Sequence, residues 1–151
     1  MKMLRSTIPT TIEIKKDIQS QGTAFADPTQ IHQIIMNLCT NAYYAMRETG
    51  GTLGVTMKDI ELSDLSAASQ LDLLPGKYIH LEITDTGIGM DAETKEKIFE
   101  PYFTTKEKDG GTGLGLYMSK MIIEDNMNGK LWVKNNLEGA LFIIELEKSD
   151  V

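Results

Sequence analysis

The chain has 151 residues, 41% of them hydrophobic, which is enough for one domain with a buried core. Its net charge of −7 and pI near 4.8 argue against a nucleic-acid surface, which needs a stripe of basic residues. The single cysteine, Cys39, excludes an internal disulfide and a cysteine-based metal cluster, and we expect it to be a small buried residue in a helix.

The first third of the chain predicts a strand followed by a long helix. Alternating isoleucines indicate a half-buried strand over residues 10–18. Asp27 as N-cap and Pro28 at the first helical position then begin a helix that extends to about Glu48. Its apolar residues follow the i, i+3, i+4, i+7 spacing of one buried face: Ile31, Ile34, Ile35, Leu38, Ala42, Ala45 and Met46.

Two more strands are predicted in the middle of the chain, over residues 52–62 and 77–85, with a loop over 63–76 between them. Alternation in the later strand assigns Ile79, Leu81, Ile83 and Asp85 to one face, and Tyr78, His80, Glu82 and Thr84 to the other. The side chain of Asp85 is therefore expected to lie on the face of the strand that faces the core. We expect both histidines, His32 and His80, to be surface residues.

The C-terminal part predicts two helices and a hairpin. The segments are a helix capped by Asp91 over 91–99, a polar stretch over 101–112, a helix over 113–125, and strands over 129–135 and 139–147. Together the elements predict an α+β fold, a two-layer α/β sandwich whose mixed, mostly antiparallel sheet of about five strands is covered on one face by three helices.

The domain organisation is simple. We expect a linker at residues 1–10, one domain over 11–148 and a short tail at 149–151. The sequence shows no signal peptide and no apolar run near the roughly 20 residues that span a bilayer. We therefore expect a soluble cytoplasmic domain, monomeric when isolated and without membrane contact of its own, inside a longer protein whose other segments can include a membrane anchor.

The long helix holds two asparagines, Asn37 and Asn41, one turn apart at the edge of its apolar face. Asparagine is a poor helix former, so the pair calls for an explanation. One is that both amides bond to water. The other is that a carboxamide oxygen ligates a hard cation such as Mg²⁺, with waters and phosphate oxygens completing the octahedron.

Asp85 ends a strand and is followed by Gly87 and Gly89. A buried carboxylate is costly unless a group hydrogen-bonds to it. That group is either an amino group of a ligand or a nearby backbone amide. The glycines permit close approach of another group, but D-x-G-x-G alone is as compatible with a turn as with a site.

A second glycine cluster precedes the last helix: Gly110, Gly111, Gly113 and Gly115. Leu116 replaces the lysine of a Walker A loop, and no strand precedes the cluster as in a dinucleotide fingerprint. It still offers free backbone N–H groups at a helix N-terminus, where phosphate binds readily. Lys106 and Lys108 in the preceding segment can add positive charge.

The order and spacing of four motifs resemble one known family. "NLCTNAYYAM", "DTGIGM", "IFEPYF" and "GGTGLGL" resemble the N box, first glycine box, F box and second glycine box of the catalytic ATP-binding domain of sensor histidine kinases. That domain belongs to the superfamily of gyrase, heat-shock chaperone and mismatch-repair ATPases with the Bergerat fold. The resemblance covers essentially the whole chain and implies ATP and Mg²⁺ as ligands.

The resemblance also implies roles for individual residues. Asn41 would ligate Mg²⁺ with Asn37 beside it, Asp85 would accept a hydrogen bond from the adenine amine, and Lys106 would help to neutralise the phosphates. Residues 101–112 would form a lid over the nucleotide. The nucleotide contacts it implies are Asn41, Ala45, Asp85, Gly87, Gly89, Met90, Phe103, Thr104, Gly111, Thr112, Gly113, Leu114, Gly115 and Leu116.

The chain departs from the family pattern in three ways. Tyr44 stands where many relatives carry a lysine, and Ala140 stands where a threonine usually helps to fix the base. The histidine-bearing dimerisation helices are not in this sequence, and neither His32 nor His80 has the surroundings of an acceptor histidine. The domain is therefore expected to be inactive or weak when it is alone.

Three functions are compatible with these motifs. The first is a histidine kinase domain that transfers the γ-phosphoryl of Mg·ATP to a histidine on separate dimerisation helices and communicates with a response regulator receiver domain. The second is an ATPase of the same fold, which would need a glutamate where Asn37 stands because an amide cannot accept a proton from water. The third is a module that binds nucleotide without transferring phosphate.

Overall fold

The computed structural model describes residues 5–6, 8–20, 22–24, 26–62, 73–103, 114–135 and 139–149. The elements in chain order are β1 (Ile12–Ile18), α2 (Pro28–Met46), β2 (Gly51–Leu62), β3 (Gly76–Thr84), α4 (Ala92–Lys97), α5 (Gly115–Met121), η2 (Ile122–Asn126), β4 (Lys130–Asn135) and β5 (Ala140–Glu147). Most of the loop predicted over 63–76 and most of the predicted lid lie outside the described residues. Within the described ranges, no helix has the length and apolar character needed to cross a membrane.

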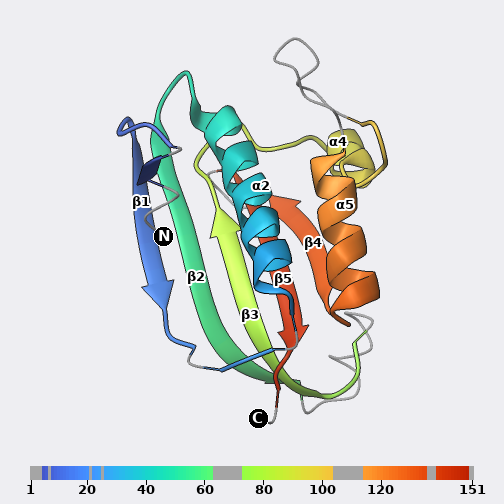
Figure 1. Cartoon of the computed structure of the whole chain (residues 1–151). Coiled ribbons are helices and arrows are strands. Elements are labelled where there is room, and N and C mark those ends of the chain that lie inside the picture. Colours follow the sequence, from blue (N-terminus) through green and yellow to red (C-terminus); the bar gives the residue numbers. More distant parts are fainter. Residues whose placement is uncertain are drawn as a thin grey trace.

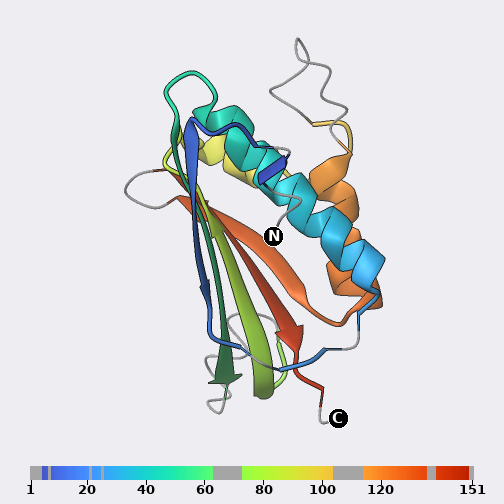
Figure 2. The ribbon, with the colours of Figure 1, turned by 60° about the vertical axis from the view of Figure 1, so that its left-hand side comes forward.

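The fold has two layers, a sheet and the helices that cover one of its faces (Figures 1 and 2). The strands are ordered β1-β2-β3-β5-β4. β1 pairs with β2 in parallel, and the other three pairs are antiparallel. The predicted two-layer α+β fold with a mixed, mostly antiparallel sheet is confirmed.

Helix α2 forms where the sequence predicts it and lies across the middle of the sheet (Figure 1). The Asp27 side chain accepts a hydrogen bond of 2.8 Å from the backbone N–H of Thr29 and caps the helix. The buried residues of α2 recur every third or fourth position, namely Ile34, Leu38, Cys39, Ala42 and Met46. Burial of Cys39 agrees with the sequence and raises the pKa of its thiol to about 12.

The helix predicted over 113–125 is not one continuous α-helix. After Met121 the chain continues in a π-helical turn, η2, and then reverses at Asn128, whose φ is 52°. The backbone N–H of Gly129 donates to the carbonyl of Ile123 at 3.0 Å. This ending keeps Ile123 in the core while the chain turns back into β4.

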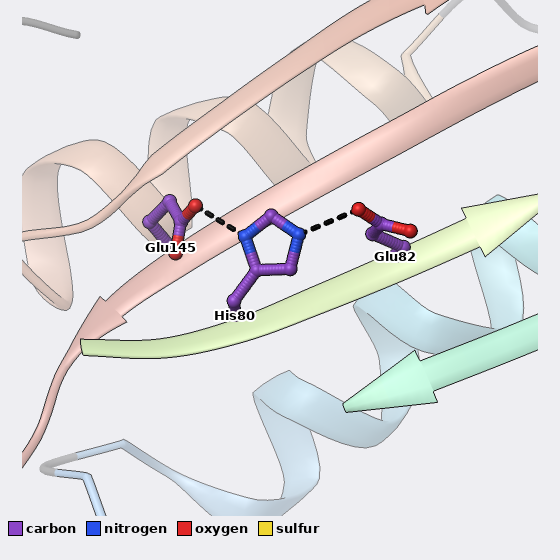
Figure 3. Close-up of polar contacts among 3 residues, drawn as sticks. All are labelled: His80, Glu82 and Glu145. Atoms are coloured by element: carbon purple, nitrogen blue, oxygen red, sulfur yellow. Dashed lines mark hydrogen bonds and ion pairs between the residues drawn. The ribbon is translucent and has the colours of Figure 1, made fainter. Parts of the chain in front are cut away.

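The expected surface position of His80 is wrong, whereas His32 is exposed as predicted. The side chain of His80 is only 11% exposed and lies between Glu82 on its own strand and Glu145 on β5 (Figure 3). The reason is that the sheet face away from the helices is itself buried at its centre. Tyr78, Ile143 and Glu145, which alternation assigns to that face, are at most 4% exposed.

Candidate functional site

Asp85 directly follows β3 and is 3% exposed. Its Oδ1 accepts hydrogen bonds from the backbone N–H groups of Gly87 at 2.9 Å and Ala140 at 3.3 Å. Burial raises the pKa of this carboxyl, and the two backbone bonds partly oppose the shift. Both bonds reach Oδ1, so the fold holds the carboxylate by this oxygen.

Gly87 and Gly139 are required by the packing around Asp85. A Cβ on Gly87 would lie 2.5 Å from the carbonyl oxygen of Ala45 on α2. A Cβ on Gly139 would lie 2.5 Å from both the carbonyl oxygen and Oδ1 of Asp85. Gly87 therefore lets α2 approach the loop, and Gly139 lets β5 approach the carboxylate.

Sequence reasoning did not single out Gly139. The signal available was a glycine at the start of the last strand, which pairs with the strand that Asp85 follows. The neighbouring backbone is also informative, because the N–H of Asp85 donates to the carbonyl of Ala140 at 3.0 Å. The backbone contact at position 140 thus forms with alanine in place of the threonine that the resemblance leads us to expect.

The turn after Gly87 is fixed by a side chain from another strand. Gly89 has φ of 70°, a conformation that glycine adopts readily. At the next residue, the side-chain amide of Asn135, the last residue of β4, accepts from the N–H of Met90 at 3.2 Å and donates to its carbonyl. The Met90 side chain packs against the core. Asn135 was also missed, because β4 is 45 residues away in sequence.

The two asparagines of α2 differ in their surroundings. The Asn37 amide donates to the hydroxyl of Ser119 on α5 at 3.3 Å, and Ser119 is 1% exposed. Asn37 therefore joins α2 to α5. Asn41 is half-buried one turn further along the same face.

The described residues contain no group of three or more His, Cys, Asp or Glu side chains that could hold a metal ion. Mg²⁺ at Asn41 would therefore take one amide oxygen from the protein and fill its other positions with water and phosphate oxygens. Mg²⁺ is commonly bound in this way in nucleotide sites.

The start of α5 lies beside Asn37. A Cβ on Gly115 would lie no closer than 3.7 Å to the Asn37 amide, so the described packing does not require glycine there. Leu114 precedes the helix without a side-chain capping bond, and Leu116 packs against the core. Phe103 is partly buried. Five predicted site residues lie outside the described residues: Thr104, Lys106, Gly111, Thr112 and Gly113.

Tyr44, which replaces the lysine of many relatives, has a cation next to it. The guanidinium carbon of Arg47 lies 5.2 Å from the centre of the Tyr44 ring. Tyr43 contacts the same ring, with centroids 5.6 Å apart. A positive charge is therefore present one turn beyond position 44, although not on the residue that the family pattern uses.

Comparison with known proteins adds independent findings. A family model described as histidine kinase-, DNA gyrase B- and HSP90-like ATPase matches residues 26–150. Sensor kinase CckA of Brucella abortus (strain 2308) is 44% identical over 99 residues, which are 66% of this chain and 10% of CckA. The chain thus spans about a tenth of the length of that relative.

Solved structures agree with the family match. The nucleotide-free catalytic domain of histidine kinase ThkA has a TM-score of 0.70 at 32% identity, with 97% of this chain and 84% of that chain covered. ThkA in complex with response regulator protein TrrA gives 0.69 at 28% identity, with 98% and 38% covered. Full-length ShkA in complex with AMPPNP gives 0.74 at 23% identity, with 99% and 29% covered, which shows the same fold.

The chain therefore belongs to the histidine kinase-, DNA gyrase B- and HSP90-like ATPase family and, within it, to the catalytic ATP-binding domains of histidine kinases.

Proposed function

We propose that this domain binds Mg·ATP and presents the γ-phosphoryl group to a histidine on the dimerisation helices of the same kinase. The observation that supports this most directly is the environment of Asp85. Its buried Oδ1 accepts from two backbone N–H groups, and in this proposal Oδ2 accepts from the exocyclic amine of adenine.

Phosphoryl transfer requires mainly positioning and charge stabilisation from the protein. Asp85 fixes the base, and Ala45, Gly87 and Met90 line the space around it. Asn41, with Asn37 beside it, would hold Mg²⁺, which supplies positive charge against the phosphates. Backbone N–H groups near Gly115 would face the phosphates, and Lys106 of the predicted lid would add positive charge there. The acceptor imidazole is itself the nucleophile, so no general base is needed from this domain.

The partners follow from this chemistry. The phosphorylated histidine passes its phosphoryl group to an aspartate of a response regulator receiver domain, and the solved complex of ThkA with the response regulator TrrA supports this kind of partner. The domain acts in the cytoplasm, where ATP is available.

Replacement of Asp85 by asparagine tests the proposal. The new Oδ1 can keep the bonds from Gly87 and Ala140, which leaves an amide NH₂ where Oδ2 was. That NH₂ would meet the adenine amine donor to donor, so ADP affinity is expected to fall about tenfold to a hundredfold. Calorimetric titration of ADP and a non-hydrolysable ATP analogue, with and without Mg²⁺, measures the effect.

Asp91→Asn is the matched control. Asp91 caps α4 by accepting from the N–H of Thr94 at 2.7 Å, and asparagine caps equally well. This variant should bind ADP like the wild type. Equal affinities of wild type and Asp85→Asn would contradict the proposed base site, and no nucleotide binding by the wild type would favour the module without kinase activity.

The surroundings of Asn37 argue against the ATPase alternative. Its amide donates to Ser119, and an amide cannot take a proton from an attacking water. We therefore expect the isolated domain to hydrolyse ATP slowly and Asn37→Ala to remove no rapid turnover. A coupled assay of ADP release checks this, and fast steady hydrolysis abolished by Asn37→Ala would support an ATPase instead.

A further inference from the structure

The loop that carries Gly89 and Met90 is attached to the sheet near its beginning, where the hydroxyl oxygen of Thr86 accepts from the N–H of Thr52 on β2 at 3.0 Å. At its beginning, the backbone of Asp85 pairs with Ala140, and at its end Asp91 caps α4. Between these points Ile88 is 91% exposed. The middle of the loop is therefore exposed, between its attachments at Thr86 and Met90.

Asn135 attaches the loop near its other end. Its amide bonds both to the N–H of Met90, at 3.2 Å, and to the carbonyl of Met90. Only a primary amide can accept and donate in one plane, as a neighbouring strand would. A carboxylate of the same shape could accept from the N–H but would repel the carbonyl oxygen.

The position of Asn135 links this attachment to the adenine site. Asn135 pairs with Ala140 in the β4–β5 ladder, and Ala140 contacts the Asp85 carboxylate. A Cβ on Gly89 would lie 3.6 Å from the Asn135 amide oxygen and 3.6 Å from the carbonyl oxygen of Gly139. The same corner of the sheet therefore holds the loop at Asp85 and at Met90.

We infer that Asn135 is a positioning residue for the nucleotide: it holds the Gly89–Met90 turn so that the adenine pocket is formed before the base arrives. This inference rests on the proposed function, because the pocket matters only if a nucleotide binds. The described side-chain bonds of Asn135 go to the backbone of Met90, beside the base site. Its effect should therefore appear in the affinity for adenine nucleotides and in the protection of the Met90 amide.

The test compares Asn135→Asp and Asn135→Ala with the neighbouring exposed Lys134→Ala as control. ADP affinity is expected to fall about fivefold to tenfold in both Asn135 variants and to stay unchanged in Lys134→Ala. The Met90 amide should exchange with solvent faster in both, because its acceptor is lost or its carbonyl is repelled. The thermal midpoint should move little, since the Asn135 side chain is exposed at a strand end.

The outcomes separate this inference from the proposed function. Wild-type ADP affinity in Asn135→Asp would overturn the inference and leave the proposed function intact. Loss of ADP affinity without faster exchange at Met90 would also overturn it, because the turn would then be held by something else. A wild-type protein that does not bind ADP would refute the proposed function, and the positioning role would fall with it.

Discussion

Replacement of Gly139 by alanine is expected to weaken both the adenine site and the fold. The new Cβ would lie 2.5 Å from the carbonyl oxygen and Oδ1 of Asp85 and 2.9 Å from the backbone nitrogen of Gly87. These atoms cannot rotate away, because the carboxylate is itself held by two backbone N–H groups. Overpacking of this kind costs about 1–3 kcal/mol of unfolding free energy. Since relief requires Asp85 to move, ADP affinity should fall about tenfold or more.

Gly22→Ala is a suitable control for this prediction. Its Cβ would lie 2.7 Å from a carbon of the Lys148 side chain, which is long and can move aside. Urea unfolding and calorimetric titration with ADP should therefore show a large effect at position 139 and a small one at position 22. Unchanged ADP affinity in Gly139→Ala would mean that Asp85 does not have to keep its present position to bind the base.

The fold could be predicted largely from local patterns. The cap at Asp27, the apolar spacing of α2 and the alternation in β3 each depend on neighbours in sequence, and each agrees with the structure. The π-helical turn after Met121 could not be predicted, because it depends on how Ile123 and β4 fit together in the core. Alternation also could not show that the second face of the sheet is buried around His80.

The candidate site could also be predicted only where it depends on residues close together in sequence. Asp85, Gly87 and Asn37 were predicted because chemistry and position coincide within short motifs. Gly139 and Asn135 were missed because their importance comes from contacts between distant segments, at Asp85 and Met90 respectively. The glycines illustrate the limit of sequence motifs. Packing within the domain explains Gly87, whereas the packing of the described residues does not require glycine at Gly115, where a phosphate contact stays a prediction.

The environment of His80 gives the other prediction with a large expected effect. Its Nδ1 contacts Oε1 of the buried Glu145, and its Nε2 lies 2.7 Å from Oε1 of Glu82 (Figure 3). A neutral imidazole has one N–H and can donate to only one of two carboxylates. The hydrogen bond to Glu145, assisted by Glu82 and opposed by burial, raises the pKa of His80 above its ordinary value of 6.5. A protonated imidazole can donate to both carboxylates, so this arrangement favours the imidazolium form.

His80→Gln should lower the unfolding free energy by about 3 kcal/mol near pH 6, because it leaves Glu145 buried without its counter-charge. Most of this destabilisation would come from the carboxylate of Glu145. That residue is 2% exposed, and its Oε2 has no hydrogen-bond partner in the described structure. Urea unfolding measures the difference. His32→Gln is the matched control, because His32 is exposed on α2 and its replacement should have little effect.

The pH dependence follows from the raised pKa of His80. A group whose pKa is higher in the folded than in the unfolded state stabilises the fold fully below its unfolded pKa, and this contribution disappears as pH rises through the folded pKa. The stability gap between wild type and His80→Gln should therefore be largest below about pH 6.5 and narrow on the alkaline side. The charged residues in register with this pair on the neighbouring strands are Lys58, opposite His80, and Lys130, opposite Glu145.

The variant Glu145→Gln tests whether the His80 ring is protonated in the folded protein. If His80 is the charged group, this variant removes its main partner, so the pKa of His80 falls toward 6.5 and the pH-dependent gap shrinks. If instead His80 is neutral in the folded protein, the gap between wild type and His80→Gln has no such pH dependence, with or without Glu145→Gln. NMR titration of the His80 ring distinguishes the two directly. A ring pKa at or below 6.5 in the wild type would refute the imidazolium between its two carboxylates.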